Sequence, residues 1–437
     1  MKQCAEDKTR PRCSLLLNTM PALPPNPAAA PLGLLLLLAA WAPTAVAWPA
    51  ATRTRLVQVQ VVFRHGARTP TAPYPNDPHK DYDYKPFGLG HLTALGRHQA
   101  YVLGQWLRSR YVDSGCAPAS EGALLDAEYA EGAVRVTASA IERTQESAAA
   151  VLAGLFPPGP SQTWGVSGVA GLGRLWFPIA YRVVPADQDH ALAGTAPCPG
   201  RHLAKEALNS SGTLRERTLR VIGGQDTLDY IEKHSGVDLD SDPTALGTVF
   251  SALQCQELLN MTIPEWSGRV YPEPLKSATN VALESHSYTP LLRRQTYGDL
   301  IAWLLSSARA HETEPRLQLY SAHDATVTAL IAALGLQPQE DAGFGIPDFS
   351  ACVLLELHQG ADGALGLKFF YRREPGGPVV RMVPKGCGAL CPLERFERLV
   401  EDELPRPGDC DLPPPPARAA LQEGGSSETR EDEDELT

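Results

Sequence analysis

Three segments of this chain repeat one plan: an apolar strand, a few polar residues and then a helix. The first has the run RLVQVQVVF at residues 55–63, followed by helical spacing of apolar residues over 92–111. The second has a short strand at 134–137 and an Ala-rich helix that ends before Pro157. Strands that alternate with helices predict an α/β fold, in which a mainly parallel sheet carries helices on both faces.

The third segment lies late in the chain and leads into a hairpin. A strand at 317–321 passes through His323 and Asp324 into a helix that ends at about Leu334, with Gly335 as its stop. The apolar runs ACVLLELHQ and LGLKFFYRR then flank the Gly/Asp-rich loop GADGALG. This arrangement predicts a pair of antiparallel strands.

Composition divides the chain into five parts. The middle is rich in Gly and Pro and has only short helical patterns, and the end is Pro-rich, then Gly/Ser-rich, then acidic. We predict a signal peptide at 1–47, an α/β core at 48–156 and 291–410, a mostly helical cap insertion at 157–290, and a disordered acidic tail at 411–437.

The leader has a positive flank and the apolar run PLGLLLLLAAWAPTAVA, which ends in a small-x-small pattern at Ala45 and Ala47. The run is too short to span a bilayer comfortably, and no second long apolar run follows. We interpret it as a cleaved signal peptide, after which the chain has no stable membrane span. Because the leader is long, a start at Met20 or retention as an anchor stays an alternative.

Seven cysteines remain once Cys4 and Cys13 of the leader are set aside. In an exported protein, seven cysteines allow up to three disulfides and one odd thiol. The sequons at Asn209 and Asn260 are candidate glycosylation sites and agree with passage through the secretory route.

The formal net charge of −11 is unevenly spread, with +2 in residues 1–47 and −6 in 423–437. The body between them is therefore modestly acidic. Nucleic-acid binding needs a basic footprint, which this body lacks, so we expect no nucleic-acid partner. Any anion site must be a local basic pocket.

Such a pocket is expected where the three strands end, because ligands of open α/β sheets bind beyond the carboxyl ends of the strands. The polar residues there are Arg64, His65 and Arg68 after the first strand, Arg143 after the second, and His323 with Asp324 after the third. Three guanidiniums on a closed core need a counter-anion. A phosphate dianion accepts their planar forks in bidentate fashion, and sulfate would fit the arginines as well.

His65 has two candidate roles between these arginines: it donates a hydrogen bond to phosphate, or it attacks phosphorus as a nucleophile. Positive neighbours lower an imidazole pKa, which favours the neutral nucleophile. Asp324 suits a general acid that later acts as a base, and His323 adds a donor to the phosphate oxygens. Because a helix start favours an ionised Asp324, a bound anion must raise its pKa. No metal or cofactor is expected, since the arginines replace a cation.

The motif RHGxRxP is far more specific than a lone histidine, and the other histidines of the chain lack comparable context. Within the motif, Gly66 is expected to let the backbone approach a ligand, and Pro70 fixes the exit of the loop. Together with the downstream HD dipeptide at a strand–helix junction, the motif is a strong indication of phosphoryl chemistry.

Through these residues the chain resembles the histidine acid phosphatases, branch 2 of the histidine phosphatase superfamily, and most closely their prostatic and lysosomal type. The similarity runs over about residues 55–410 and includes the segments SAIERT, YSAHD and GCGALCPLERF. The resemblance implies a phosphoglycerate-mutase-like fold with a smaller helical cap. It also implies His65 as nucleophile, Asp324 as proton donor, and the three arginines with His323 as phosphate ligands.

The resemblance further implies the disulfides Cys198–Cys410, Cys255–Cys352 and Cys387–Cys391, which leave Cys116 odd. It implies an acid phosphatase, secreted or in the lysosomal lumen, that hydrolyses small phosphate monoesters through a phosphohistidine. Phosphoproteins and lysophospholipids are further candidate substrates, and a homodimer is common in the family.

Three other functions are alternatives to this one. A selective phosphatase for phytate or lysophosphatidate stays open, although the acidic body speaks against the basic outer pocket that phytases often carry. An inactive secreted phosphate-binding protein of the same fold is disfavoured because all six catalytic-type residues are intact. A mutase of the same superfamily is disfavoured by the export and cysteine pattern.

Overall fold

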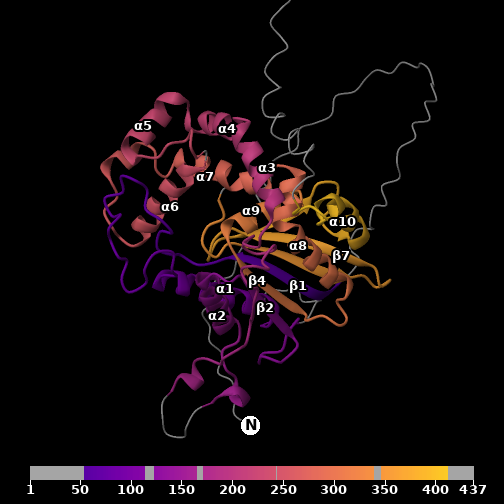
Figure 1. Ribbon diagram of the computed structural model, residues 1–437. Helices are drawn as coiled ribbons and strands as arrows, with labels where there is room; N and C mark the ends of the chain where they lie inside the picture. Colours follow the sequence, from indigo (N-terminus) through magenta and orange to yellow (C-terminus); the bar gives the residue numbers. More distant parts are fainter. Residues whose placement is uncertain (1–53, 114–122, 165–170, 243, 339–345, 412–437) are drawn as a thin grey trace, which may run out of the picture. The chain divides into compact units, whose positions relative to one another are not determined.

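The strand–helix plan of the sequence builds a single sheet with helices on both faces (Figure 1). The structure is a computed structural model that describes residues 54–113, 123–164, 171–242, 244–338 and 346–411. The predicted signal peptide, Cys116 and the tail from residue 412 lie outside the described residues. Among the helices described, none has the length and apolar character that crossing a membrane requires.

The sheet has the strand order β3-β2-β4-β1-β6-β7-β8-β5, with β9 paired to β7. The strands are β1 Arg55–Arg64, β2 Val134–Ala138, β3 Arg182–Val183, β4 Leu317–Ala322, β5 Leu336–Pro338, β6 Cys352–Gln359, β7 Leu365–Arg372, β8 Val379–Pro384 and β9 Cys391–Pro392. The α/β prediction is confirmed, and so is the antiparallel pairing of β6 with β7.

The sheet is mixed, so the prediction of a mainly parallel sheet holds only for the strands β3, β2, β4 and β1. The strands β6, β7 and β8 pair antiparallel, as does β5 with β8. For β6, β7 and β8 the physical reason is the length of the connections, because short loops such as the one between β6 and β7 can join antiparallel strands only. The parallel part is the part that positions the predicted site.

The described residues form ten α-helices, among which are the three predicted over 92–111, before Pro157 and up to about Leu334. They are α1 Ala94–Tyr111, α2 Glu142–Leu155, α3 Pro199–Ser210, α4 Thr213–Ile222, α5 Gln225–Ser235, α6 Ala245–Leu258, α7 Leu275–Glu284, α8 Pro290–Arg309, α9 Asp324–Ala333 and α10 Leu393–Val400. Helix α1 begins after Thr93, whose hydroxyl accepts a hydrogen bond from the backbone N–H of Gly96. Gly335, at a φ of 56°, follows the end of α9.

Strand β1 is buried on both faces, which explains why its polar residues do not alternate toward solvent. Val59, Val61 and Phe63 pack with α1 and α2. Gln58 and Gln60 are also buried, and their side-chain amides donate to backbone carbonyls of α8, those of Ser307 and Leu304. These hydrogen bonds fix the depth of α8 on the second face of the sheet, where α9 and α10 also lie.

The predicted helical insertion contains α3 to α7, and within 157–198 the described segments have only short 3₁₀ turns and β3. Helices α4 to α7 lie together (Figure 1) and share an apolar cluster with Tyr74 and Ile346, apart from the two clusters on the sheet. Helices α4 and α5 are separated by Gly223 and Gly224, which have φ values of 89° and 107°. The boundaries of a separate cap domain stay a prediction.

Two of the three disulfides implied by the resemblance are present, Cys198–Cys410 and Cys387–Cys391. The third, Cys255–Cys352, is wrong: both cysteines are buried free thiols. They belong to different apolar clusters, since Cys255 packs with Ala67 and Phe349, whereas Cys352 packs in the core between the sheet and α1.

The glycine of the RHGxRxP motif serves helix packing, which differs from the ligand approach expected from the sequence. A Cβ atom on Gly66 would lie 2.1 Å from the carbonyl oxygen of Gly96 in α1, and a Cβ on Gly96 would lie 2.0 Å from that of Ala67. These two glycines let α1 pack backbone to backbone against the loop that carries His65.

Candidate active site

The three predicted strand ends meet at one edge of the sheet. Arg64 of β1 is in register with Ala322 of β4, and Ala138 of β2 is in register with Ser321 of β4. Because β1, β4 and β2 are parallel neighbours, the residues that follow them emerge side by side (Figure 1). The structure thus brings together the six side chains that the sequence singled out.

His65 is buried, and its tautomer is fixed by its own loop. Its Nδ1 lies 2.8 Å from the carbonyl oxygen of Gly66. A carbonyl can only accept, so Nδ1 carries the proton and Nε2 keeps its lone pair. Burial holds the pKa of His65 well below its ordinary value, and Arg143, Arg64, His323 and Arg68 lower it further. The neutral imidazole predicted from the motif is therefore favoured even in acidic solution.

Arg64 is buried and is held on three sides. Its Nη2 lies 2.7 Å from Oδ2 of Asp324, its Nη1 donates to the carbonyl of Pro347 at 2.6 Å, and its guanidinium lies 4.1 Å from the ring centroid of Phe349. The Phe349 ring also lies beside His65, at 5.9 Å between centroids. Phe349 thus supports both the arginine and the histidine of the motif.

Asp324 starts α9, as predicted, and is ionised in the free site. Burial alone would raise the pKa of its carboxyl, but Arg64, Arg68 and His323 together hold that pKa well below its usual range. Its Oδ1 also accepts from the backbone N–H of Ala325 at 2.9 Å.

His323 lies next to His65, with the rings 5.5 Å apart and nearly perpendicular. Its Nε2 lies 3.1 Å from the hydroxyl oxygen of Ser139, and its Nδ1 lies 3.5 Å from Nη2 of Arg143. Burial and then Arg143 lower the pKa of His323 to about 3. Both ring nitrogens therefore have protein partners. His323 can donate a hydrogen bond to a phosphate only if it gives up its contact with Ser139 or with Arg143.

Arg68 and Arg143 complete a strongly positive site. Arg143 donates weakly to the carbonyl of Gly90, and burial lowers its pKa to about 10. In the described structure, the Nε atoms of Arg64, Arg68 and Arg143 are all buried without a hydrogen-bond partner. One carboxylate therefore balances three guanidiniums, and this arrangement suits a dianion that accepts several hydrogen bonds.

Sequence reasoning missed several residues that support this site. Phe349 stands at no periodic position, so nothing in the sequence marks it, whereas Ser139 could have been found because it directly follows the second strand in the segment SAIERT. Thr326 could have been found, because it is the third residue of α9 and forms a capping box with His323. Its hydroxyl also donates to the carbonyl of Leu192 at 2.5 Å, which fixes the start of the helix.

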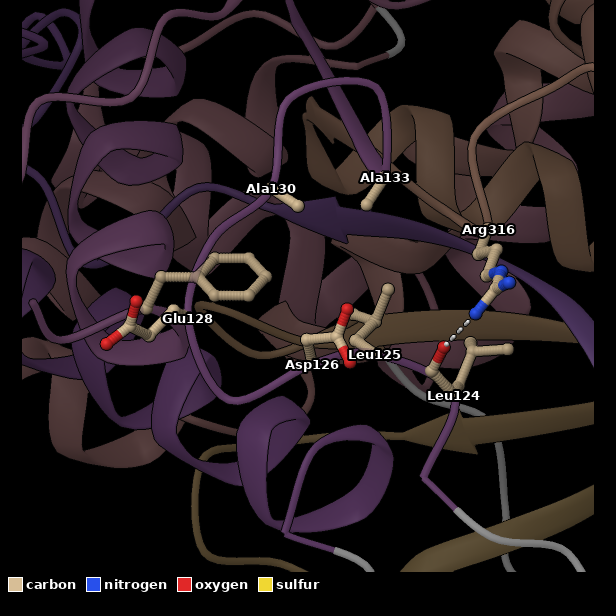
Figure 2. A pocket seen from close by; sticks show the side chains of 8 residues that line it. Leu124, Leu125, Asp126, Glu128, Ala130, Ala133 and Arg316 are labelled. Carbon is tan, nitrogen blue, oxygen red and sulfur yellow. Dashed lines mark hydrogen bonds between the residues drawn. The ribbon is translucent and has the colours of Figure 1, made fainter. Parts of the chain in front are cut away.

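A separate cavity of about 240 Å³ lies near the amino-terminal ends of β2 and β4 (Figure 2). Arg316, just before β4, donates there to the carbonyl of Leu124, and Asp126 and Glu128 also line it. None of the six predicted site residues lines this cavity. It is therefore distinct from the site at the carboxyl ends of the strands.

The sequence matches the family model of the histidine phosphatase superfamily (branch 2) over residues 55–207 and 248–383. Prostatic acid phosphatase of Bos taurus is 33% identical over 353 residues, 78% of this chain and 84% of that protein. Testicular acid phosphatase of Homo sapiens is 32% identical over 388 residues, 83% of this chain and 84% of that protein. Lysosomal acid phosphatase of Bos taurus is 29% identical over 371 residues, 82% of this chain and 81% of that protein.

Among solved structures, the apo form of Hafnia alvei phytase is similar, with a TM-score of 0.59 and 17% identity. The alignment covers 84% of this chain and all of that one. At this identity the likeness shows the fold alone, and it agrees with the predicted phosphoglycerate-mutase-like fold.

Proposed function

The chain belongs to branch 2 of the histidine phosphatase superfamily and is a phosphatase, and on that premise we propose that it hydrolyses phosphate monoesters through a phosphohistidine on His65. The observation that carries the proposal is the bond from Nδ1 of His65 to the Gly66 carbonyl. It leaves the Nε2 lone pair available in a ring whose pKa burial and neighbouring arginines keep low.

In the first step, the phosphate oxygens bind Arg64, Arg68 and Arg143. Nε2 of His65 attacks phosphorus, a P–N bond forms, and the P–O bond to the alcohol breaks. Protonated Asp324 gives its proton to the departing alkoxide. The arginines offset the negative charge of the phosphoryl group as it passes between oxygen and nitrogen.

In the second step, Asp324 is a carboxylate and takes a proton from water. The water oxygen attacks phosphorus, the P–N bond breaks, and inorganic phosphate leaves with His65 restored. Asp324 thus acts first as acid and then as base, and the protein needs no further proton carrier.

Asp324 must be protonated for the first step, although the free site favours its ionised form. Arg64 and Arg68 are among the groups that lower its pKa, and both are proposed phosphate ligands. A bound dianion would offset their charge and repel the carboxylate, so its pKa would rise when substrate binds. Acidic solution would favour the same protonation.

A trapping experiment tests the covalent step. The enzyme is mixed with a ³²P-labelled monoester, quenched within milliseconds into alkali, which preserves phosphohistidine, and digested. We expect the label on the peptide that contains His65. Steady turnover without label on that peptide would contradict the proposal.

We also propose that this protein is exported and is either secreted or lysosomal. The names of the prostatic and lysosomal relatives support this, as do the two disulfides and the exposed positions of Asn209 and Asn260. Mass spectrometry of the protein from its native source would read the mature N-terminus and any attached glycans. An unglycosylated protein that keeps residues 1–47 would argue against export.

A further inference from the structure

Arg68 is held by a helix of the insertion, unlike the other two arginines. Its Nη2 donates to the hydroxyl oxygen of Ser251 at 2.9 Å, and its Nη1 lies 3.6 Å from Sγ of Cys255. Nη1 also donates to the carbonyl of Thr69 at 3.1 Å. Ser251 and Cys255 are one turn apart on α6, so they present their side chains on the same face.

The two α6 side chains are placed where they can fix the guanidinium. Cys255 is fully buried and packs with Ala67, the neighbour of Arg68 in the chain, and with Phe349. Burial raises the pKa of the Cys255 thiol, so it stays neutral. Arg68 itself is only 7% exposed, which limits the orientations its side chain can take.

Ser251 and Cys255 are neutral partners of Arg68, and this affects the charge of the site. Arg64 forms an ion pair with Asp324 at 2.7 Å, whereas the two α6 side chains that hold Arg68 carry no charge. A hydroxyl and a thiol can therefore orient Arg68 without offsetting its positive charge. The buried Nε of Arg68 still lacks a hydrogen-bond partner within the described residues.

We propose that Ser251 and Cys255 are positioning residues for the phosphatase reaction, which hold Arg68 in the orientation that binds the phosphoryl group. The inference rests on the proposed function, because it takes Arg68 as a phosphate ligand. By this inference the helical insertion contributes to catalysis, because its helix α6 orients Arg68, a phosphate-binding residue that follows β1 in the chain.

The test is a double-mutant cycle read out by the inhibition constant of inorganic phosphate and by kcat/KM. Ser251→Ala is expected to weaken phosphate inhibition and lower kcat/KM by about 5- to 20-fold, since the lost bond involves a charged group. Cys255→Ala, which removes a weaker acceptor, is expected to change both by about 2- to 3-fold. In an Arg68→Ala background, Ser251→Ala should have no further effect on either quantity.

Ser241→Ala is the matched control, because its hydroxyl bonds to Asp238 on an exposed loop of the same insertion. It should leave both quantities unchanged. If Ser251→Ala weakens phosphate inhibition and lowers kcat/KM equally with and without Arg68, Ser251 acts through general stability. This outcome overturns the inference but leaves the proposed function standing. If Arg68→Ala leaves phosphate inhibition intact, Arg68 is no ligand, and both the inference and this part of the proposed function fail.

Discussion

Replacing His65 by Ala is expected to lower kcat by about 10⁴-fold or more, as removal of an activated nucleophile does in other hydrolases. Alanine cannot form the P–N bond, and no second histidine can take over. His323 lies 5.5 Å away between ring centroids, with both nitrogens engaged by Ser139 and Arg143. The measurement is steady-state hydrolysis of an aryl phosphate across acidic pH.

The same variant should still bind inorganic phosphate, because the three arginines remain. Retained phosphate binding with lost turnover would separate chemistry from ligand recognition. His98→Ala on the exposed face of α1 is the control and should keep its activity. A His65→Ala enzyme with more than a tenth of the original kcat would rule out the nucleophile role.

Replacing Asp324 by Asn is expected to lower kcat by about 10²- to 10⁴-fold for an alkyl phosphate, the usual size of a general acid–base contribution. The loss in the first step should be smaller for an aryl phosphate, because its leaving group needs less protonation. The second step still lacks its base, so phosphoenzyme should accumulate. A burst of released phenol, followed by slow turnover and stronger ³²P labelling of His65, is the expected observation.

The substitution also removes the charge that faces Arg64, and this effect has a defined pH dependence. Since the pKa of Asp324 is lowered in the folded state, the ionised carboxylate stabilises the fold above its ordinary pKa. That contribution is lost only as pH falls through the lowered pKa. Asp324→Asn should therefore melt at a lower temperature at mildly acidic pH.

Asp240→Asn is the matched control, since Asp240 pairs with Arg215 at an exposed position. It should change neither the burst nor the melting temperature measurably. If Asp324→Asn gives equal losses for alkyl and aryl phosphates and no phosphoenzyme, Asp324 does not transfer the proton.

The site could be located from the sequence because parallel strands place their carboxyl ends together. Arg64, Arg143 and His323 are far apart in the chain, yet each follows a recognisable strand, so their proximity follows from sheet geometry. The ionised state of Asp324 was predicted from its place at the start of a helix. In the structure, burial raises the pKa of this carboxyl, and Arg64, Arg68 and His323 lower it more than the backbone N–H of Ala325 at the helix start does.

Contacts across the fold could not be predicted in this way. Nothing in the helical pattern of α6 indicates that Ser251 faces Arg68, and Phe349 precedes β6 without any periodic context. The Cys255–Cys352 pair was wrong for the same reason: a pairing carried over from a family does not report how this core packs. In the antiparallel half of the sheet, only the hairpin of β6 and β7 could be predicted from the sequence.

The placement of β1 has a consequence for how the enzyme is made. This strand precedes His65 and is synthesised early, but its two neighbours are β4 and β6, both of which follow the helical insertion. One edge of β1 can pair only once residues 317–322 have been made, and the other only once residues 352–359 have been made. Such long-range pairing is slow to form. Any fragment that stops before Leu317 lacks the proton donor as well as both neighbouring strands. Activity should therefore arise late in biosynthesis and all at once.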